Sequence, residues 1–274
     1  MERRYVQTIT QLYHQLHQEG YSTAEIGQVR QAYAFAAEHF CCLFRPSGKT
    51  FIAHLVGTAS ILVSVYAPLN IVLAGLLHAI YRHGDFGTLG KAISEPKRNT
   101  VRAIIGDTAE GYVFQYSTLR WNDEVISELY GKAEKLGPVD RDVILLRLAN
   151  ELEDQLDHGM LYCHNAQNRL RGITNPKNLL IPLTEKLGYP ILAAELSRVF
   201  KETRCFAINR DLFPPQGKQG VFRRIPFSCR QSLSHYLFQK MSINWARALD
   251  TIWLLREKGY RSRKWVKAVL QRSG

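Results

Sequence analysis

Apolar residues recur every three or four positions along most of the first 200 residues, which is the spacing of amphipathic helices. The pattern predicts helices over residues 5–18, 22–40, 50–66, 68–81, 98–105, 109–116, 138–157, 182–187 and 191–203. No stretch alternates apolar and polar residues as a half-buried strand would. The sequence therefore predicts an all-α protein.

Local signals mark where these helices begin and end. Ser22 and Glu25 have the spacing of a capping box at the start of the second helix. Pro46 and Gly48 indicate a turn, and three glycines between residues 84 and 90 indicate a loop. Residues 209–228 hold three prolines and two glycines, so we expect an irregular loop there. A last pair of helices is predicted over 242–258 and 262–271.

Composition favours a globular cytoplasmic protein. The chain has 274 residues, of which 46% are hydrophobic, so wholesale disorder is not expected. No apolar run approaches the roughly 18 residues of a membrane span, and the polar N-terminus does not resemble a secretory signal. Five cysteines without a CxxC pair suggest reduced thiols rather than a disulfide framework or a structural zinc site.

Positive charge gathers at one end of the chain. The formal net charge is +12, and residues 201–274 carry all of it, with 16 Lys and Arg against 4 Asp and Glu. This asymmetry predicts a helical domain over residues 1–200 and a basic C-terminal extension over 201–274. Such an extension attracts nucleic acid, an anionic membrane or an acidic partner protein, or is simply a solvated basic surface.

The best-known catalytic motifs are missing. The sequence has no GxxxxGK[ST] loop, no GxGxxG after a strand, no GxSxG and no HExxH. Their absence argues against a P-loop ATPase, a dinucleotide-binding enzyme, an α/β-hydrolase and a zincin.

Two histidines on consecutive predicted helices are the strongest candidates for chemistry. His54 lies 14 residues before Pro68, where the turn is expected, and His78 lies 10 residues after it. An antiparallel pair of helices would bring both side chains to one pocket. An unpaired buried imidazole costs roughly 1–3 kcal/mol, so each needs a metal, a carboxylate, a carbonyl or a ligand as partner.

Four segments around these histidines resemble the HD-domain superfamily, and in particular the Rel/Spo hydrolases of guanosine tetraphosphate. They are AYAFAAEH at 32–39, RPSGKTFIAH at 45–54, AGLLH at 74–78 and LRLAN at 146–150. The resemblance spans roughly residues 28–160 and implies an HD-domain-like helical bundle. It also implies a divalent metal, usually manganese, held by two histidines and two aspartates.

The metal-binding pattern is degenerate here. His54 and His78 match the two histidines, whereas Ala79 and Asn150 stand where the resemblance implies aspartates. Arg82 and His83 replace a further acidic pair. Hard divalent ions prefer anionic oxygen ligands, so these changes make the pocket better suited to an anion. A centre rebuilt from His54, His78 and Asp154 around manganese or iron remains open.

The same residues supply candidates for catalysis and substrate binding. His54, His78 and Asp154 are the candidate catalytic residues, with His54 and His78 as candidate metal ligands. Arg45 matches the arginine that the resemblance places beside the substrate, and a guanidinium suits phosphate or carboxylate. The other candidate substrate-binding residues are Lys49, Arg82, His83 and Asn150.

Two functions follow from this pattern. The first is a divergent, hydrolase-like HD-domain enzyme with an altered metal centre that acts on a phosphorylated or otherwise anionic small molecule. The alternative is a catalytically silent HD-like module that binds an anionic ligand, nucleic acid or a partner protein.

Overall fold

The structure, a computed structural model, describes residues 5–87, 92–163, 166–175, 178–206 and 222–223. The chain divides into two compact units, Met1–Arg224 and Ile225–Gly274. Only the first contains described residues, so the predicted helices over 242–258 and 262–271 lie outside them. The division expected near residue 200 stays a prediction; the last described helix runs through that position to Cys205.

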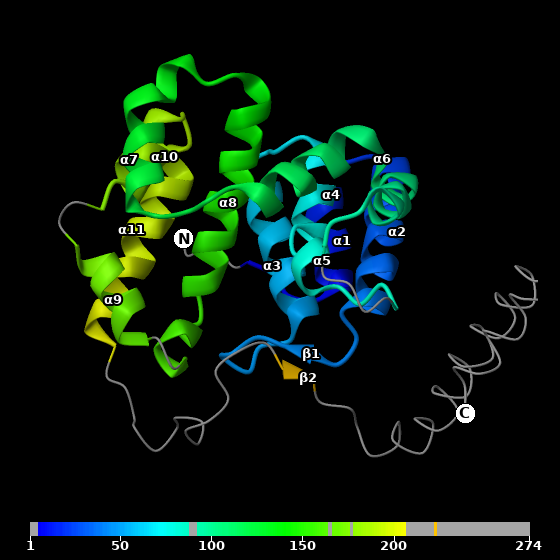
Figure 1. Ribbon diagram of the computed structural model, residues 1–274, viewed down its shortest axis with the longest axis horizontal. Coiled ribbons are helices and arrows are strands. Elements are labelled where there is room, and N and C mark those ends of the chain that lie inside the picture. The colour runs from blue at the N-terminus through cyan, green and yellow to red at the C-terminus, as the bar shows by residue number, and fades with distance from the viewer. Residues whose placement is uncertain (1–4, 88–91, 164–165, 176–177, 207–221, 224–274) are drawn as a thin grey trace, which may run out of the picture. The chain divides into compact units, whose positions relative to one another are not determined.

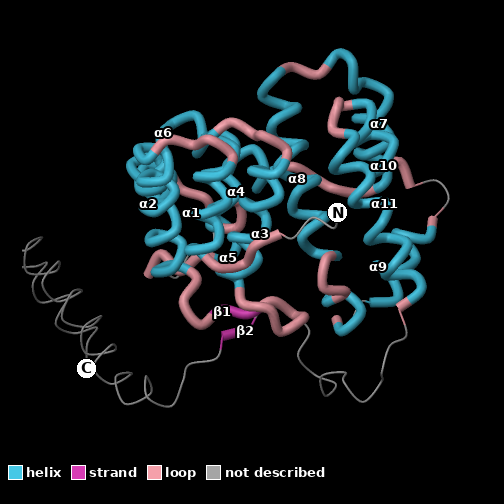
Figure 2. Tube along the Cα trace, turned by 180° about the vertical axis from the view of Figure 1, so that it is seen from behind, coloured by secondary structure: helices cyan, strands magenta, loops and turns pink. Residues whose placement is uncertain are grey.

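The first unit is all-α, as the sequence predicts (Figure 1). Its helices are α1 (Ile9–Gln18), α2 (Thr23–His39), α3 (Phe51–Ser64), α4 (Leu69–Leu77), α5 (Ile80–His83), α6 (Glu95–Thr118), α7 (Asp123–Lys132), α8 (Pro138–Gln155), α9 (Ala166–Thr174), α10 (Leu180–Lys186) and α11 (Pro190–Cys205). Two short 3₁₀ turns are η1 (Ala133–Lys135) and η2 (Gly159–Tyr162). In the described residues, strand is limited to β1 (Leu43–Phe44) and β2 (Phe222–Arg223), which pair antiparallel (Figure 2).

Several predicted boundaries need correction. The helix expected over 68–81 is two helices, because the backbone turns at His78 and Ala79 between α4 and α5. The two helices expected over 98–105 and 109–116 are present as the two parts of α6, which is broken at Gly106, where φ is 79°; only their outer ends extend further, to Glu95 and Thr118. Helices α7 and α9 were not predicted. The expected capping box is present, since Ser22 and Glu25 exchange both hydrogen bonds.

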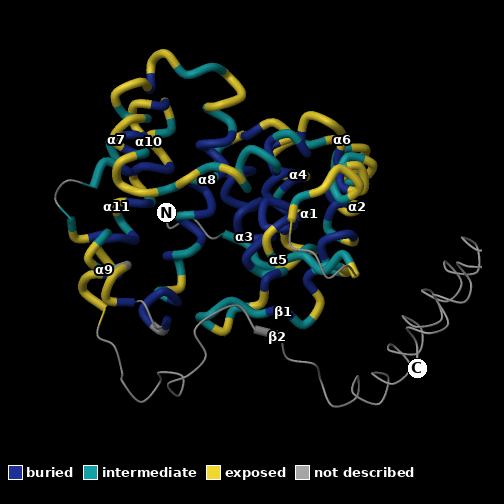
Figure 3. Tube along the Cα trace, in the orientation of Figure 1, coloured by how far each residue is buried: buried dark blue, intermediate teal, exposed yellow. Residues whose placement is uncertain are grey.

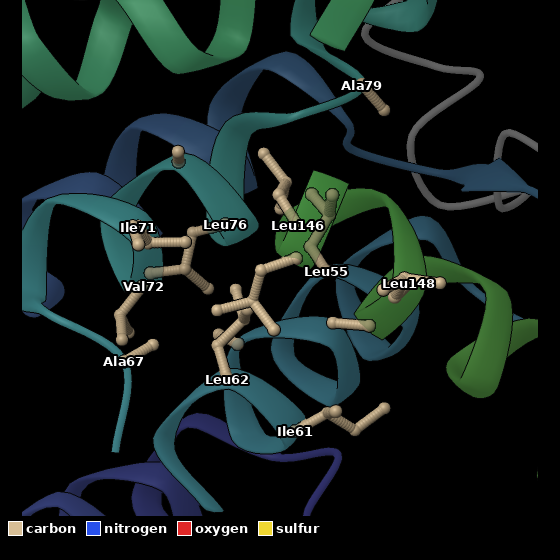
Figure 4. Close-up of a cluster of buried hydrophobic side chains, with 14 of the residues drawn as sticks. Leu55, Ile61, Leu62, Ala67, Ile71, Val72, Leu76, Ala79, Leu146 and Leu148 are labelled. Carbon is tan, nitrogen blue, oxygen red and sulfur yellow. The ribbon is translucent and has the colours of Figure 1, made fainter. Parts of the chain in front are cut away.

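Helices α3 and α4 form the centre of the unit. They pack on each other, α8 covers α3, and α2 and α6 cover α4. Twelve of the fourteen residues of α3 are buried, and the buried part of the chain follows these central helices (Figure 3). Leu55 and Leu62 of α3 lie with Leu76 of α4 and Leu146 of α8 in one apolar cluster (Figure 4). The candidate histidines therefore lie on the central, buried pair of helices.

No helix in the described part of the chain is long and apolar enough to cross a membrane.

Candidate active site

His54 and His78 meet at one end of the central helix pair. His54 lies in the first turn of α3, which Thr50 caps by accepting the N–H of Ala53. His78 ends α4, and its Nδ1 donates to the carbonyl of Gly75 at 2.8 Å. The two Nε2 atoms are 3.2 Å apart, and both residues are at most 3% exposed. The structure thus brings together the two histidines that the sequence singled out.

Glu153 of α8 is the acidic partner of this pair. Its Oε2 contacts Nδ1 of His54, and its side chain is 1% exposed. Burial raises the pKa of Glu153 to about 8, although Lys49 and Arg45 act in the opposite direction. Burial also holds the pKa values of His54 and His78 well below the ordinary value, and the charge of Arg45 lowers that of His54 further. At neutral pH both imidazoles are uncharged.

These contacts define two protonation states. The Gly75 carbonyl can only accept, so neutral His78 keeps its proton on Nδ1 and presents a lone pair at Nε2. When Glu153 is protonated it donates to Nδ1 of His54, and the Nε2–H of His54 can donate to His78, but that N–H then faces the Nη1–H donor of Arg45 at 2.7 Å, a contact that disfavours this state. When Glu153 is ionised it accepts from Nδ1–H of His54, and both Nε2 lone pairs face each other. Ionisation of Glu153 therefore changes the tautomer of His54.

Arg45 lies against the same histidine. It follows β1 in the tight turn before α3, where its N–H donates to the carbonyl of Lys49. Its Nη1 is 2.7 Å from Nε2 of His54 and 2.5 Å from Oδ1 of Asp154. When His54 holds its proton on Nδ1, Arg45 donates to its Nε2. The guanidinium thus places a fixed positive charge on one side of the His54–His78 pair.

Lys49 provides a second positive charge, beside the carboxyl groups of Glu153 and Asp157. Its Nζ contacts Oε1 of Glu153 and lies 3.3 Å from Oδ2 of Asp157. Arg45, Lys49, Glu153, Asp154 and Asp157 line a small pocket beside the histidines. Each buried acid in this pocket therefore has a basic neighbour, as buried charges require.

The histidines open onto a much larger cavity of about 660 Å³. Its lining comes from the turn before α3, from α3, α5 and α8, from the turn between α4 and α5, and from the end of α6 with the segment that joins it to α7. The lining contains the predicted residues Arg45, His54, His78, Arg82, His83, Asn150 and Asp154. The volume lies within the roughly 300–1,000 Å³ that is usual for a small-molecule site.

One wall of the cavity is aromatic and arginine-rich. Tyr116 packs edge-on against His78, with ring centroids 5.0 Å apart, and its hydroxyl accepts from Nη1 of Arg147 at 2.7 Å. Arg147 lies 5.4 Å from the ring of Trp121 and donates to Glu151. Burial raises the pKa of Tyr116 to about 12, so the phenol stays protonated at neutral pH.

A family model described as "Domain of unknown function (DUF6817)" matches residues 38–120 of the chain. The matched segment includes Arg45, His54, His78 and Tyr116, and it ends before α8 with Glu153 and Asp154. No significant match is found among curated proteins.

Seven of the eight residues predicted to form the site line the large cavity, and Lys49 lines the small pocket beside it. Asp154 shares a face of α8 with Asn150, as their four-residue spacing predicts. Sequence reasoning missed Glu153, whose three-residue spacing from Asn150 was the available signal. It also missed Tyr116 and Arg120, because nothing in the sequence links α6 and its following loop to the histidines. Arg147 lies in the LRLAN segment of α8 but was not singled out as a site residue.

His54, Glu153 and Asp154 can hold a metal ion, since one ligand atom of each lies within 4.8 Å of the others. A mixed nitrogen and oxygen donor set suits manganese, iron or zinc. His78 adds a second imidazole nitrogen. The positive charges of Arg45 and Lys49 oppose a cation here, so a metal would have to displace Arg45 from Asp154.

Proposed function

We propose that this chain is a divergent HD-domain-like enzyme that acts on a phosphorylated or otherwise anionic small molecule in the large cavity. The resemblance to the Rel/Spo hydrolases supports this proposal, because residues of three of the four segments, 45–54, 74–78 and 146–150, line one cavity. The single observation that carries it is the buried chain of Glu153, His54 and His78 that ends at that cavity.

Charge makes an anion the expected ligand. Four arginines line the cavity, at positions 45, 82, 120 and 147, whereas Asp154 is the only carboxylate in its described lining. Asp154 pairs with Arg45, and Glu151 pairs with Arg147. Arg82 and Arg120 are exposed and have no ion-pair partner in the described part of the chain. These two guanidinium groups are available for bidentate contacts with phosphate or carboxylate oxygens.

Proton transfer is the proposed role of the histidines. With Glu153 ionised, Nε2 of His78 offers a lone pair that can accept a proton from water or from a substrate hydroxyl. His54, held by Glu153, stabilises the positive charge that His78 then acquires. A base of this kind typically contributes 10²- to 10⁴-fold to a rate.

If a divalent metal such as manganese or iron binds, His54, His78 and Asp154 are its proposed ligands, and Glu153 is the further carboxylate within reach. When bound, it would supply Lewis-acid polarisation of a phosphoryl oxygen. Elemental mass spectrometry of protein purified without chelators tests this part of the proposal. A stoichiometric metal that is lost in Asp154→Asn supports it, and metal-free protein with phosphatase activity overturns it.

Release of inorganic phosphate from a panel of nucleoside and sugar phosphates tests the enzyme proposal. We expect His78→Asn and His54→Asn to lower the rate by at least 10²-fold. His17→Asn, on the exposed face of α1, is the control and should leave the rate unchanged. Equal rates in all four proteins would contradict a catalytic role for the histidines.

The second candidate function is a silent module that binds the same class of anion. It is favoured by Ala79, which lines the cavity where the resemblance implies an aspartate. In that case anionic ligands would stabilise the protein against heat, but no phosphate would be released under any metal condition.

A further inference from the structure

Tyr116 presents a hydroxyl group at the wall of the large cavity. The residue lies near the C-terminal end of α6, and its ring packs edge-on against His78, with ring centroids 5.0 Å apart. The hydroxyl oxygen accepts a hydrogen bond from Nη1 of Arg147 at 2.7 Å. Among the described residues, no group accepts the proton of this hydroxyl. The proton is therefore available to a molecule that binds beside His78.

Arg147 orients and polarises this hydroxyl. Its Nη2 donates to Glu151 at 2.6 Å, and its guanidinium lies 5.4 Å from the ring of Trp121. Because the guanidinium is a planar, rigid fork, these two contacts fix the direction of the N–H that Tyr116 accepts. A phenol that accepts from a cation becomes a stronger donor through its own proton, since hydrogen bonds in a chain polarise one another.

Arg147 holds this position although one of its own donors is unsatisfied. Its Nε is buried and has no hydrogen-bond partner in the part of the chain that the structure describes. A buried donor without a partner destabilises a folded protein, and a catalytic role is one explanation for such a group. The guanidinium is thus placed to serve Tyr116 and Glu151 rather than to satisfy all of its own donors.

We propose that Tyr116 is a catalytic residue, whose hydroxyl donates a hydrogen bond to a phosphoryl oxygen of a phosphate monoester in the cavity. This inference rests on the proposed function and narrows its substrate from an anion in general to a phosphate ester. In phosphoryl transfer, negative charge is spread over three equatorial oxygens, and fixed donors aimed at such oxygens lower the barrier. Tyr116 places its donor next to His78, the proposed base.

The step needs no co-reactant other than water. A bond forms between the water oxygen and phosphorus as the bond from phosphorus to the ester oxygen breaks. One water proton goes to Nε2 of His78, which later returns it to solvent, and the leaving oxygen takes a proton from solvent. Tyr116 keeps its own proton throughout, so its contribution is electrostatic.

Tyr116→Phe removes the hydroxyl and keeps the ring against His78. Tyr112→Phe is the matched control, because Tyr112 lies one turn earlier on α6 and its hydroxyl donates to Asp142 at 2.7 Å. Tyr112 is not among the described residues that line the cavity. Both full-length variants would be assayed for phosphate release from the phosphate ester that the wild type hydrolyses best, and thermal melting checks that each is folded.

We expect Tyr116→Phe to lower kcat by about 10²- to 10³-fold, as loss of an oxyanion donor does in other enzymes, and to change KM by less than about threefold. An interaction made only in the transition state lowers kcat and kcat/KM equally, whereas lost ground-state binding raises KM. Tyr112→Phe should keep the wild-type kcat. A wild-type kcat in a folded Tyr116→Phe protein would overturn the proposal.

Orthovanadate gives a readout that does not depend on turnover. It adopts the five-coordinate geometry of a phosphoryl group in transfer, whereas inorganic phosphate resembles the product, and transition-state analogues bind more tightly than ground-state ligands. In calorimetric titrations, Tyr116→Phe should bind vanadate at least roughly tenfold more weakly than the wild type and phosphate with unchanged affinity. Equal losses for the two anions would assign Tyr116 a merely structural role and overturn the proposal.

The outcomes separate this inference from the proposed function. Phosphate release by the wild type together with an unaffected Tyr116→Phe contradicts only the role of Tyr116. A wild type that releases no phosphate from any ester of the panel overturns both. If Tyr116→Phe melts below the assay temperature, Arg147→Lys replaces it, since that variant keeps the hydroxyl but loses the guanidinium fork. It should show the same selective loss of vanadate affinity, and unchanged vanadate affinity would overturn the proposal.

Discussion

Glu153 controls the proton chemistry of the site, because its own charge decides where His54 carries its proton. The carboxyl is buried between the imidazole of His54 and the ammonium of Lys49. Burial raises its pKa to about 8, so it changes charge just above neutral pH. Perturbed acids in clefts are typical of functional sites. In the proposed mechanism His78 can act as a base only when Glu153 is ionised. We therefore expect activity to rise between pH 7 and pH 9.

Replacing Glu153 with glutamine should flatten part of the pH dependence of stability. Between pH 4.5 and 8 the folded state holds a proton on Glu153 that the unfolded state has released. Proton binding is therefore greater in the folded state, and stability falls as pH rises through this window, by up to about 1.4 kcal/mol per pH unit. In Glu153→Gln the side chain stays neutral at every pH, so this contribution to the pH dependence of the free energy of unfolding is absent.

Urea unfolding from pH 5 to pH 8 measures the effect. The free energy of unfolding of the wild type, relative to that of Glu153→Gln, should decrease across the series. Parallel pH profiles for the two proteins would show that Glu153 titrates normally.

At the scale of elements, the close approach of α3 and α8 brings Glu153 to His54. Gly57 of α3 makes this possible, since a Cβ at that position would lie 2.8 Å from Oε1 and 2.9 Å from Cγ of Glu153. The site therefore depends on the absence of a side chain one turn beyond His54.

Gly57→Ala should push Glu153 away from the histidine and cost roughly 1–3 kcal/mol of stability. Gly27→Ala is the matched control, because Gly27 lies within α2 and a Cβ there would meet nothing within 4 Å. That control should be neutral or stabilise by about 0.4–1 kcal/mol. Equal melting temperatures for the two variants would show that α8 does not approach α3 this closely.

The break in α6 is held by a buried carboxylate. Glu110, 1% exposed, accepts two hydrogen bonds from Arg98 and one each from Arg102 and Tyr81. Both arginines precede the break at Gly106, and Glu110 follows it. Burial opposes ionisation, but the hydrogen bonds from Arg98 and Tyr81 hold the pKa of Glu110 below its ordinary value. Tyr81 belongs to α5, which also carries Arg82 of the cavity lining. The cluster therefore also holds α5 in place beside the cavity.

Glu110→Gln should destabilise the protein by roughly 2–3 kcal/mol, because Arg98 and Arg102 each lose their ion pair with the buried carboxylate. Glu128→Gln removes an exposed pair with Lys132 and should cost no more than about 0.5 kcal/mol. Chemical denaturation of both variants at pH 7 makes the comparison. Similar losses in the two proteins would be inconsistent with the buried cluster.

Sequence periodicity found the central helices because α3 and α4 are long, apolar and bounded by turn residues. It did not predict the backbone turn at Ala79, since alanine is a good helix former and no glycine or proline marks the end of α4. Glu153 was missed for a related reason. A carboxylate on a charged stretch of α8 is usually solvated, and only the contact of α8 with α3 buries it.

At the scale of the whole chain, residues 201–274 carry the entire excess of positive charge. We propose that this segment attracts a polyanion, independently of the cavity. Replacing Arg261, Arg263, Lys264 and Lys267 with glutamine should weaken heparin or single-stranded RNA binding. A plot of the logarithm of the RNA-binding constant against the logarithm of salt concentration should also become less steep. Its slope should fall by about 0.7 for each phosphate contact that is lost. Fluorescence anisotropy at several salt concentrations checks this, and unchanged slopes would argue against a polyanion site in the segment.

Calorimetric titration with inorganic pyrophosphate tests the central claim, that the cavity binds an anionic small molecule, most directly. We predict saturable binding with one site, and at least a tenfold rise in Kd for Arg82→Gln and for Arg120→Gln, since a charged hydrogen bond contributes about 1.5–3 kcal/mol. Arg30→Gln, on the exposed face of α2, should bind as the wild type does. Equal affinity in all four proteins would contradict an anion site in this cavity.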